Sequence, residues 1–211
     1  MDQRVAGYVP ADLVSSSVGR LMSQQSTMPH TGSRVALLET SVGPATLLLQ
    51  AKLRASSGRH DAGVPLSRTD AQALEKYWGA CTQLLETAIQ VALNEEMDDD
   101  GCEVLYGRAG LLYALHLLQA ELALLHDSGV SIRRSEDTAV SAIASLCSDA
   151  NVQALVDDIM KRGKIGAREY REELASLRDE REKVPPLMWR WHATRYLGAA
   201  HGIGEMAFSL T

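Results

Sequence analysis

The sequence is poor in aromatic residues and in long uninterrupted apolar runs. Aromatic residues make up 5% of the 211 residues, which is few for a protein built from aromatic and β-branched strands. A chain rich in Leu and Ala favours helices instead. The most apolar stretch, Leu111 to Leu125, is interrupted by polar residues, whereas a membrane-spanning helix needs about 20 mostly apolar residues. We therefore expect an all-α protein without a transmembrane segment.

The chain also lacks an excess of positive charge and an apolar leader. Its formal net charge is -6, and binding to phosphates requires a concentrated basic face. Residues 1–19 include Asp2, Arg4 and Asp12 and contain no continuous apolar core of the kind that a signal peptide carries. We expect no nucleic-acid partner and no secretion.

Cysteine is scarce and widely spaced. Cys81, Cys102 and Cys147 form no Cys-x-x-Cys pair and have no histidine at metal-ligand spacing. An odd number of cysteines without a disulfide framework fits a reducing compartment, in which such residues usually serve as small buried hydrophobes. The sequence therefore predicts a cytoplasmic protein with no metal site formed by these cysteines.

Apolar residues that recur at three- and four-residue steps predict a series of helices. Residues 1–31 mix Ser, Pro, Gly and Gln and are expected to form an irregular arm, followed by one helical domain over 32–211. Gly163 and Gly166 are expected to end one of its helices. One helix is expected to start near residue 46. The others are expected over residues 67–94, 105–125, 135–161 and 168–183.

An internal repeat indicates how these helices are arranged. Gly43, Gly107 and Gly202 each lie in a turn that leads directly into an apolar helix, and the intervals between them have room for further helices. Glycine allows the start of a helix to approach a neighbour or a ligand closely. The pattern predicts a partial α/α toroid of helical hairpins, with the glycine turns gathered at one end around a cavity.

Three motifs resemble the eukaryotic lanthionine synthetase C-like family. They are Leu105-Tyr-Gly-Arg-Ala-Gly110, Pro186-Leu-Met-Trp-Arg-Trp-His192 and Gly198-Ala-Ala-His-Gly202, of which the last is the most specific. Gln3-Arg4 matches more loosely, and together these motifs extend over residues 1–204. The resemblance implies an α/α barrel of inner and outer helices.

The resemblance also implies a chemistry. Bacterial members add a cysteine thiol to dehydroalanine or dehydrobutyrine, and eukaryotic relatives are associated with glutathione addition to such residues. A zinc ion held by two cysteines and a histidine in the C-terminal half of the barrel would lower the pKa of the thiol. These zinc ligands are not found in this sequence, where Glu205 replaces a glycine that the family has after Gly202. We expect a shortened member with about the first half of the barrel and no bound zinc.

Four residues are candidates for the site. His201 matches a family histidine that is an acid/base candidate. Arg108 in the second glycine turn could bind a carboxylate of glutathione or of a peptide, although a cap arginine would also fit. Glu103 could supply a carboxylate at the mouth of the barrel, or simply a charge near a helix N-terminus. Arg4 follows from the loose terminal match alone.

The sequence thus leaves more than one function open. The first is thiol or glutathione addition to dehydroamino acids, which we expect to be absent from this chain alone. The alternative is a non-catalytic protein that binds glutathione or a peptide or interacts with another chain, and a glycosidase is weaker because paired carboxylates are not evident. Apolar helix faces left uncovered in a half-barrel would favour self-association.

Overall fold

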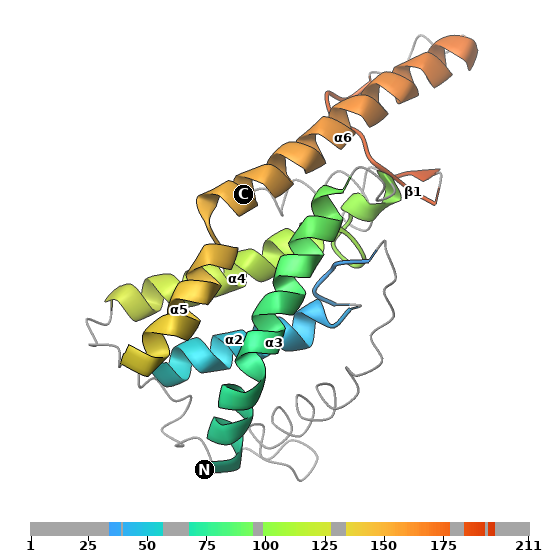
Figure 1. The fold of residues 1–211 in the computed structure, drawn as a ribbon. Coiled ribbons are helices and arrows are strands. Elements are labelled where there is room, and N and C mark those ends of the chain that lie inside the picture. Colours follow the sequence, from blue (N-terminus) through green and yellow to red (C-terminus); the bar gives the residue numbers. More distant parts are fainter. Residues whose placement is uncertain are drawn as a thin grey trace, which may run out of the picture.

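The structure is a computed structural model that describes residues 34–38, 40–56, 68–94, 99–127, 134–177, 184–192 and 194–196. The predicted arm over 1–31 and the third glycine turn, at Gly202, lie outside these residues. The described part is helical, which confirms the all-α prediction (Figure 1). Its elements are α2 (Val42–Ser56), α3 (Arg68–Leu93), the 3-10 helix η3 (Asp99–Cys102), α4 (Arg108–Asp127), α5 (Arg134–Leu146), α6 (Asp149–Leu177), β1 (Arg190–Trp191) and β2 (Thr194–Arg195).

Helices α2 and α4 run side by side in the same direction (Figure 1). The Val35 amide, just before α2, donates to the Tyr106 carbonyl just before α4, at 3.0 Å. Helix α2 begins at Val42, whose amide donates to Thr40 Oγ1 at 3.1 Å, four residues before the expected start at Thr46. The turns at Gly43 and Gly107 therefore lie at the same end of the molecule, as predicted for these two.

Close backbone contacts explain why both turns use glycine. A Cβ atom at Gly43 would lie 2.1 Å from the Leu37 carbonyl oxygen, and one at Gly107 would lie 2.2 Å from the Gly101 carbonyl oxygen. No side chain fits at such distances. The recurring glycines thus allow the chain to pass tightly over the start of each of the two parallel helices.

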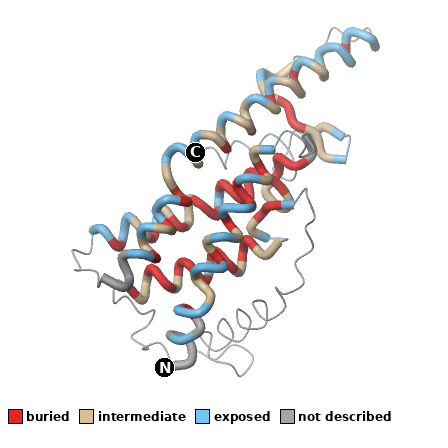
Figure 2. The backbone as a smooth tube through the Cα atoms, viewed as in Figure 1, coloured by how far each residue is buried: buried red, intermediate tan, exposed pale blue. Residues whose placement is uncertain are grey.

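Helix α4 lies in the middle of the core (Figure 2). It contacts every other described helix, with α2 along one side and α3, α5 and α6 around it. Apolar burial of this kind is the main favourable contribution to folding. The fully buried leucines and isoleucines come from five helices: Leu48, Leu49, Leu53, Leu85, Leu111, Leu112, Leu115, Leu118, Ile143, Leu155 and Ile159.

The stretch expected as one helix over 135–161 is in fact divided. Helix α5 ends at Leu146 and α6 starts at Asp149, with Asn151 Nδ2 donating to the Leu146 carbonyl at 3.0 Å. This side chain satisfies a carbonyl that the end of α5 leaves without a helical partner. The predicted boundary was wrong because the apolar spacing continues across the break.

The expectation that Gly163 and Gly166 end a helix was also wrong, since α6 runs through both to Leu177. Their role is to let another segment approach. A Cβ at Gly163 would lie 2.5 Å from Trp189 Cζ2, and one at Gly166 would lie 2.1 Å from the Met188 carbonyl oxygen. Because the two glycines carry no side chain, the segment before β1 can lie directly against the backbone of α6.

A short antiparallel hairpin, β1–β2, is the one sheet in the described residues, with Trp191 paired to Thr194. His192 in its turn has φ 48°, a conformation that residues other than glycine seldom adopt. The hairpin is anchored through the segment before it, because Trp189 Nε1 donates to the Ile159 carbonyl at 3.0 Å and the Met188 amide donates to the Gly163 carbonyl at 2.9 Å.

Two stretches of the described residues are long and apolar enough to cross a membrane by length and composition, Arg108–Asp127 and Thr138–Ser176. The first is α4, half of whose most apolar window is buried inside the protein. A core helix passes the same test, so this observation is weak evidence for a membrane span.

Candidate functional site

The turn between η3 and α4 holds two of the predicted site residues. Glu103 is 1% exposed, and its carboxylate accepts hydrogen bonds from the Leu105 amide, at 3.0 Å, and from the Tyr106 amide. Its own carbonyl accepts from the Gly107 amide at 2.9 Å. The Glu103 side chain therefore holds the turn in shape by satisfying amides that precede the first turn of α4.

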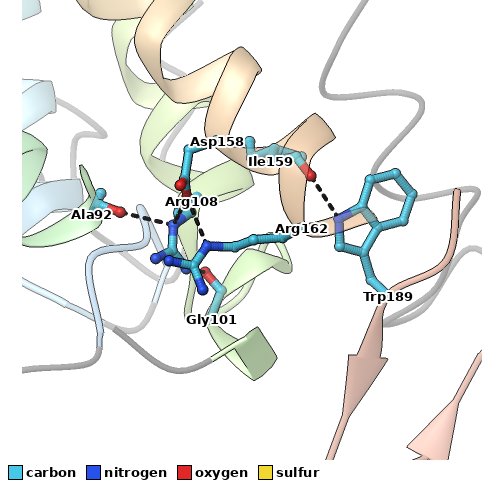
Figure 3. Close-up of polar contacts among 7 residues, drawn as sticks. All are labelled: Ala92, Gly101, Arg108, Asp158, Ile159, Arg162 and Trp189. Carbon is cyan, nitrogen blue, oxygen red and sulfur yellow. Dashed lines mark hydrogen bonds and ion pairs between the residues drawn. The ribbon is translucent and has the colours of Figure 1, made fainter. Parts of the chain in front are cut away.

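Arg108, at the start of α4, is completely buried. Its Nε donates to the Ala92 carbonyl at 2.8 Å and its Nη1 to the Gly101 carbonyl at 3.2 Å. Nε also lies 2.7 Å from Asp158 Oδ2 on α6 (Figure 3). This guanidinium thus connects the end of α3, the 3-10 helix η3 and the middle of α6, which agrees with the structural role that the sequence left open.

Asp158 binds a second guanidinium as well. Arg162 Nε, one turn further along α6, lies 2.8 Å from the same Oδ2 atom (Figure 3). Burial, the largest cause, lowers the pKa of Arg108; the nearby Arg162 also lowers it, while Cys102 and Asp158 raise it. A buried arginine stays protonated at neutral pH, so Asp158 balances a charge that would otherwise be costly to bury.

Asp158 and Arg162 were not among the site residues predicted from the sequence. A signal was present, because an acidic and a basic residue four positions apart, next to the buried Leu155 and Ile159, suggest a partly buried ion pair. No sequence pattern connects this pair to Arg108, fifty residues earlier.

The outer side of the same turn carries aromatic side chains. The Arg34 guanidinium lies 4.6 Å from the centre of the Tyr106 ring, and Trp191 stacks parallel to Tyr106 with centroids 6.0 Å apart. His192 meets Trp191 edge to face at 4.0 Å. These half-exposed or exposed side chains form a surface at the glycine-turn end, which we call the aromatic stack (Arg34, Tyr106, Trp191 and His192).

The described residues do not fit a zinc ion. They contain no cluster of three or more His, Cys, Asp or Glu side chains that could hold a metal. The three cysteines lie in different elements, are buried and form no disulfide. Burial raises the pKa of Cys81 and of Cys147 to about 12, which disfavours the thiolate form that binds zinc.

The remaining predicted residues, His201 and Arg4, lie outside the described residues. The structure therefore brings Glu103 and Arg108 together at one turn and leaves the predicted four-residue site untested. All contacts of Glu103 and Arg108 described here are with other residues of the same chain.

Comparison with known families adds the decisive observation. The sequence matches the family described as lanthionine synthetase C-like protein over residues 68–211. The chain belongs to this family. No solved structure matches it.

The lanthionine synthetase C-like match starts at the first residue of α3 and includes the second glycine turn, the Arg108–Asp158–Arg162 cluster and the hairpin. Residues 1–67, to which the resemblance was also extended through Gln3-Arg4, lie outside the match. Helix α2 is nevertheless packed on α4 in the same structure.

Proposed function

We propose that this chain forms the glycine-turn end of a lanthionine synthetase C-like barrel, the scaffold of proteins that add thiols to dehydroamino acids in peptides. The observation that carries the proposal is the parallel pair α2 and α4, joined before their first turns by the Val35–Tyr106 hydrogen bond. Parallel neighbours with equivalent turns at one end are the arrangement that a toroid of helical hairpins requires.

We further propose that the 211-residue chain alone does not catalyse thiol addition. Such a reaction needs a metal or base that activates the substrate thiol. The three cysteines here, which would have to bind zinc as thiolates, are separately buried in apolar surroundings that favour the protonated form. Arg108 and Glu103 are saturated by contacts inside the chain, which supports a role in shaping the mouth of the barrel. His201 remains the acid/base candidate.

Mass spectrometry tests this proposal. The purified chain is incubated with glutathione and a dehydroalanine peptide, with zinc or with a chelator, and adduct formation is compared with a protein-free control. We expect the same slow rate in all samples. Zinc-dependent acceleration that is lost in His201→Asn and kept in His126→Asn, an exposed histidine of α4, would contradict the proposal and support the enzyme.

The aromatic stack favours a second candidate function, non-catalytic binding of glutathione or of a peptide. Stacked rings beside an arginine offer a rigid surface with both apolar and charged contacts. Titration with glutathione or an acidic peptide, followed by tryptophan fluorescence, is expected to give saturable quenching that is lost in Trp191→Phe. The matched control Trp78→Phe changes a half-buried ring of α3, so equal loss in both variants would contradict binding at the stack.

The non-catalytic candidate function also includes self-association of the chain. Large apolar side chains are exposed on the two parallel helices, notably Leu47 of α2 and Tyr113 and Leu124 of α4. Exposed apolar area of this kind favours association between copies. Light scattering is expected to show oligomers at micromolar protein, and a monomer at all concentrations would contradict this.

A further inference from the structure

A small, solvent-open cleft lies between α6 and the chain segment that forms the hairpin. Its walls carry three guanidinium groups and one carboxylate, and Met188 and Trp189 also line it. The charged residues are Arg162, Arg190, Arg195 and Glu169. Neither the structural role of Arg108 nor the proposed function uses this cleft.

Arg195 is held in a fixed orientation at the cleft. Its side chain is 11% exposed, and Nη1 lies 2.6 Å from Glu173 Oε2. The guanidinium also lies over the Tyr170 ring, 5.2 Å from its centre. A planar group fixed by a carboxylate at one nitrogen and by an aromatic ring presents its remaining nitrogens in a defined direction.

Those remaining nitrogens have no hydrogen-bond acceptor. Nε and Nη2 of Arg195 are both buried without a hydrogen-bond partner in the described structure. The carboxylate of Glu169 lies 3.7 Å from Arg195 Nη2 and 3.7 Å from Arg190 Nη1, which is too far for a hydrogen bond. Buried donors of this kind are rare and destabilising unless another group supplies the acceptor.

The two atoms lie on the same edge of the guanidinium. Nε–H and Nη2–H point in parallel, and this edge matches two oxygens carried by one carbon or phosphorus atom. The three arginines are balanced by Asp158, Glu169 and Glu173, with which they form ion pairs. Recognition would therefore depend on the geometry of the edge more than on net charge.

We propose that this cleft binds an oxyanion group, a carboxylate or a phosphate, through Nε and Nη2 of Arg195. Arg190 supplies a second cation, and Glu169 competes with the ligand for both arginines. The cleft is open to solvent, whereas Nε and Nη2 are themselves covered, so the oxyanion must displace neighbouring side chains to reach the guanidinium edge.

NMR titration of the full 211-residue chain tests the proposal. Trp189 lines the cleft, and its indole N–H signal is easily followed because the chain has only three tryptophans. Sodium phosphate and sodium acetate are added separately, with sodium chloride holding the ionic strength constant. Saturable shifts with either salt support the site and identify the preferred oxyanion, whereas shifts with neither salt overturn it.

Variants separate the guanidinium edge from charge in general. Arg195→Lys keeps the charge and loses the edge, so affinity should fall about tenfold or more. Glu169→Gln removes the competing carboxylate and should raise affinity several-fold. Lys164→Gln, an exposed change on the same helix, is the control and should leave affinity unchanged.

Equal affinity of Arg195→Lys and the native chain would overturn the proposal. If Arg195→Lys does not fold, Glu169→Gln decides the matter, because unchanged or weaker binding in that variant contradicts competition by Glu169.

Discussion

The two halves of the described structure are held together by different forces. In the first half, α2, α3 and α5 pack around α4 through leucine, isoleucine and alanine side chains. In the second, only a few of the described residues in the later part of α6 and none of those in the hairpin are buried, and the rest are half-buried or exposed (Figure 2). Arginine–carboxylate pairs connect α6 to α4, and the Trp189 indole and two close-contact glycines connect α6 to the segment before β1.

This difference indicates how each half should respond to change. Apolar packing is non-directional, so a core of many leucines tolerates changes of similar volume. A joint made of a few buried charges depends on each partner, since removal of one leaves the other buried and unpaired. The Arg108–Asp158–Arg162 cluster, which connects α4 and α6, is therefore expected to be more sensitive to substitution than the apolar core.

The largest effect is expected from Asp158→Asn. This change leaves the buried Arg108 and Arg162 without their shared carboxylate, and such a loss costs about 3–5 kcal/mol of unfolding free energy. Urea unfolding followed by circular dichroism measures it. The control is Asp157→Asn, an exposed neighbour on the same helix, expected within about 0.5 kcal/mol of the native chain. Similar losses of unfolding free energy in both variants would mean that the buried cluster contributes no more to stability than an exposed carboxylate does.

A smaller effect is expected from Gly163→Ala. The added methyl would meet the Trp189 ring at 2.5 Å, and overpacking of this kind costs about 1–3 kcal/mol. Tryptophan fluorescence during urea unfolding reports the free energy and the displacement of the ring. The matched control is Gly79→Ala in α3, where a Cβ meets nothing within 4 Å, and where alanine should stabilise the helix by about 0.5–1 kcal/mol. Opposite signs are the expected result, and two stabilising changes would exclude the tight contact on α6.

The smallest effect concerns the thiols of the apolar half. Burial raises the pKa of Cys81 and of Cys147 from 9.0 to about 12. Because the folded state holds these protons more tightly than the unfolded state, their contribution to stability is complete below pH 9 and is lost progressively as the pH rises toward 12. At pH 9 the loss is less than about 1 kcal/mol per thiol.

Thiol reactivity checks this directly. At pH 8 the native chain should react with a chromogenic thiol reagent far more slowly than the urea-unfolded chain, in which all three cysteines are accessible. Rapid native reaction at Cys81 or Cys147 would show that the apolar half opens easily and would reverse the order of sensitivity given above.

Several elements could be predicted because their signals are local. The helix expected over 67–94 is confirmed as α3, Arg68–Leu93, since its apolar spacing and its polar start lie within one segment. The break between α5 and α6 could not be predicted, because it is fixed by Asn151 and Ser148 contacts rather than by a change in spacing. Gly163 and Gly166 misled for a related reason, since a glycine required by a distant neighbour looks the same in sequence as one that ends a helix.

The candidate site divides in the same way. The motif around Gly107 indicated the correct turn and the correct family, and Glu103 and Arg108 do lie at that turn. Their roles as ligand contacts stay predictions, because the identity of a charged residue does not say whether its partner is a substrate or its own chain. His201 and Arg4 stay predictions as well.

The sequence by itself determined that the chain is all-α, that Gly43 and Gly107 lie at the starts of apolar helices, and that it belongs to the lanthionine synthetase C-like family. These properties follow from periodicity and motif, which are written in neighbouring residues. Only the tertiary structure decided that Asp158 balances both Arg108 and Arg162 and that Arg195 turns an unsatisfied edge toward a cleft. Burial and pairing of charges depend on residues brought together from distant parts of the chain, and no local pattern records which of them will meet.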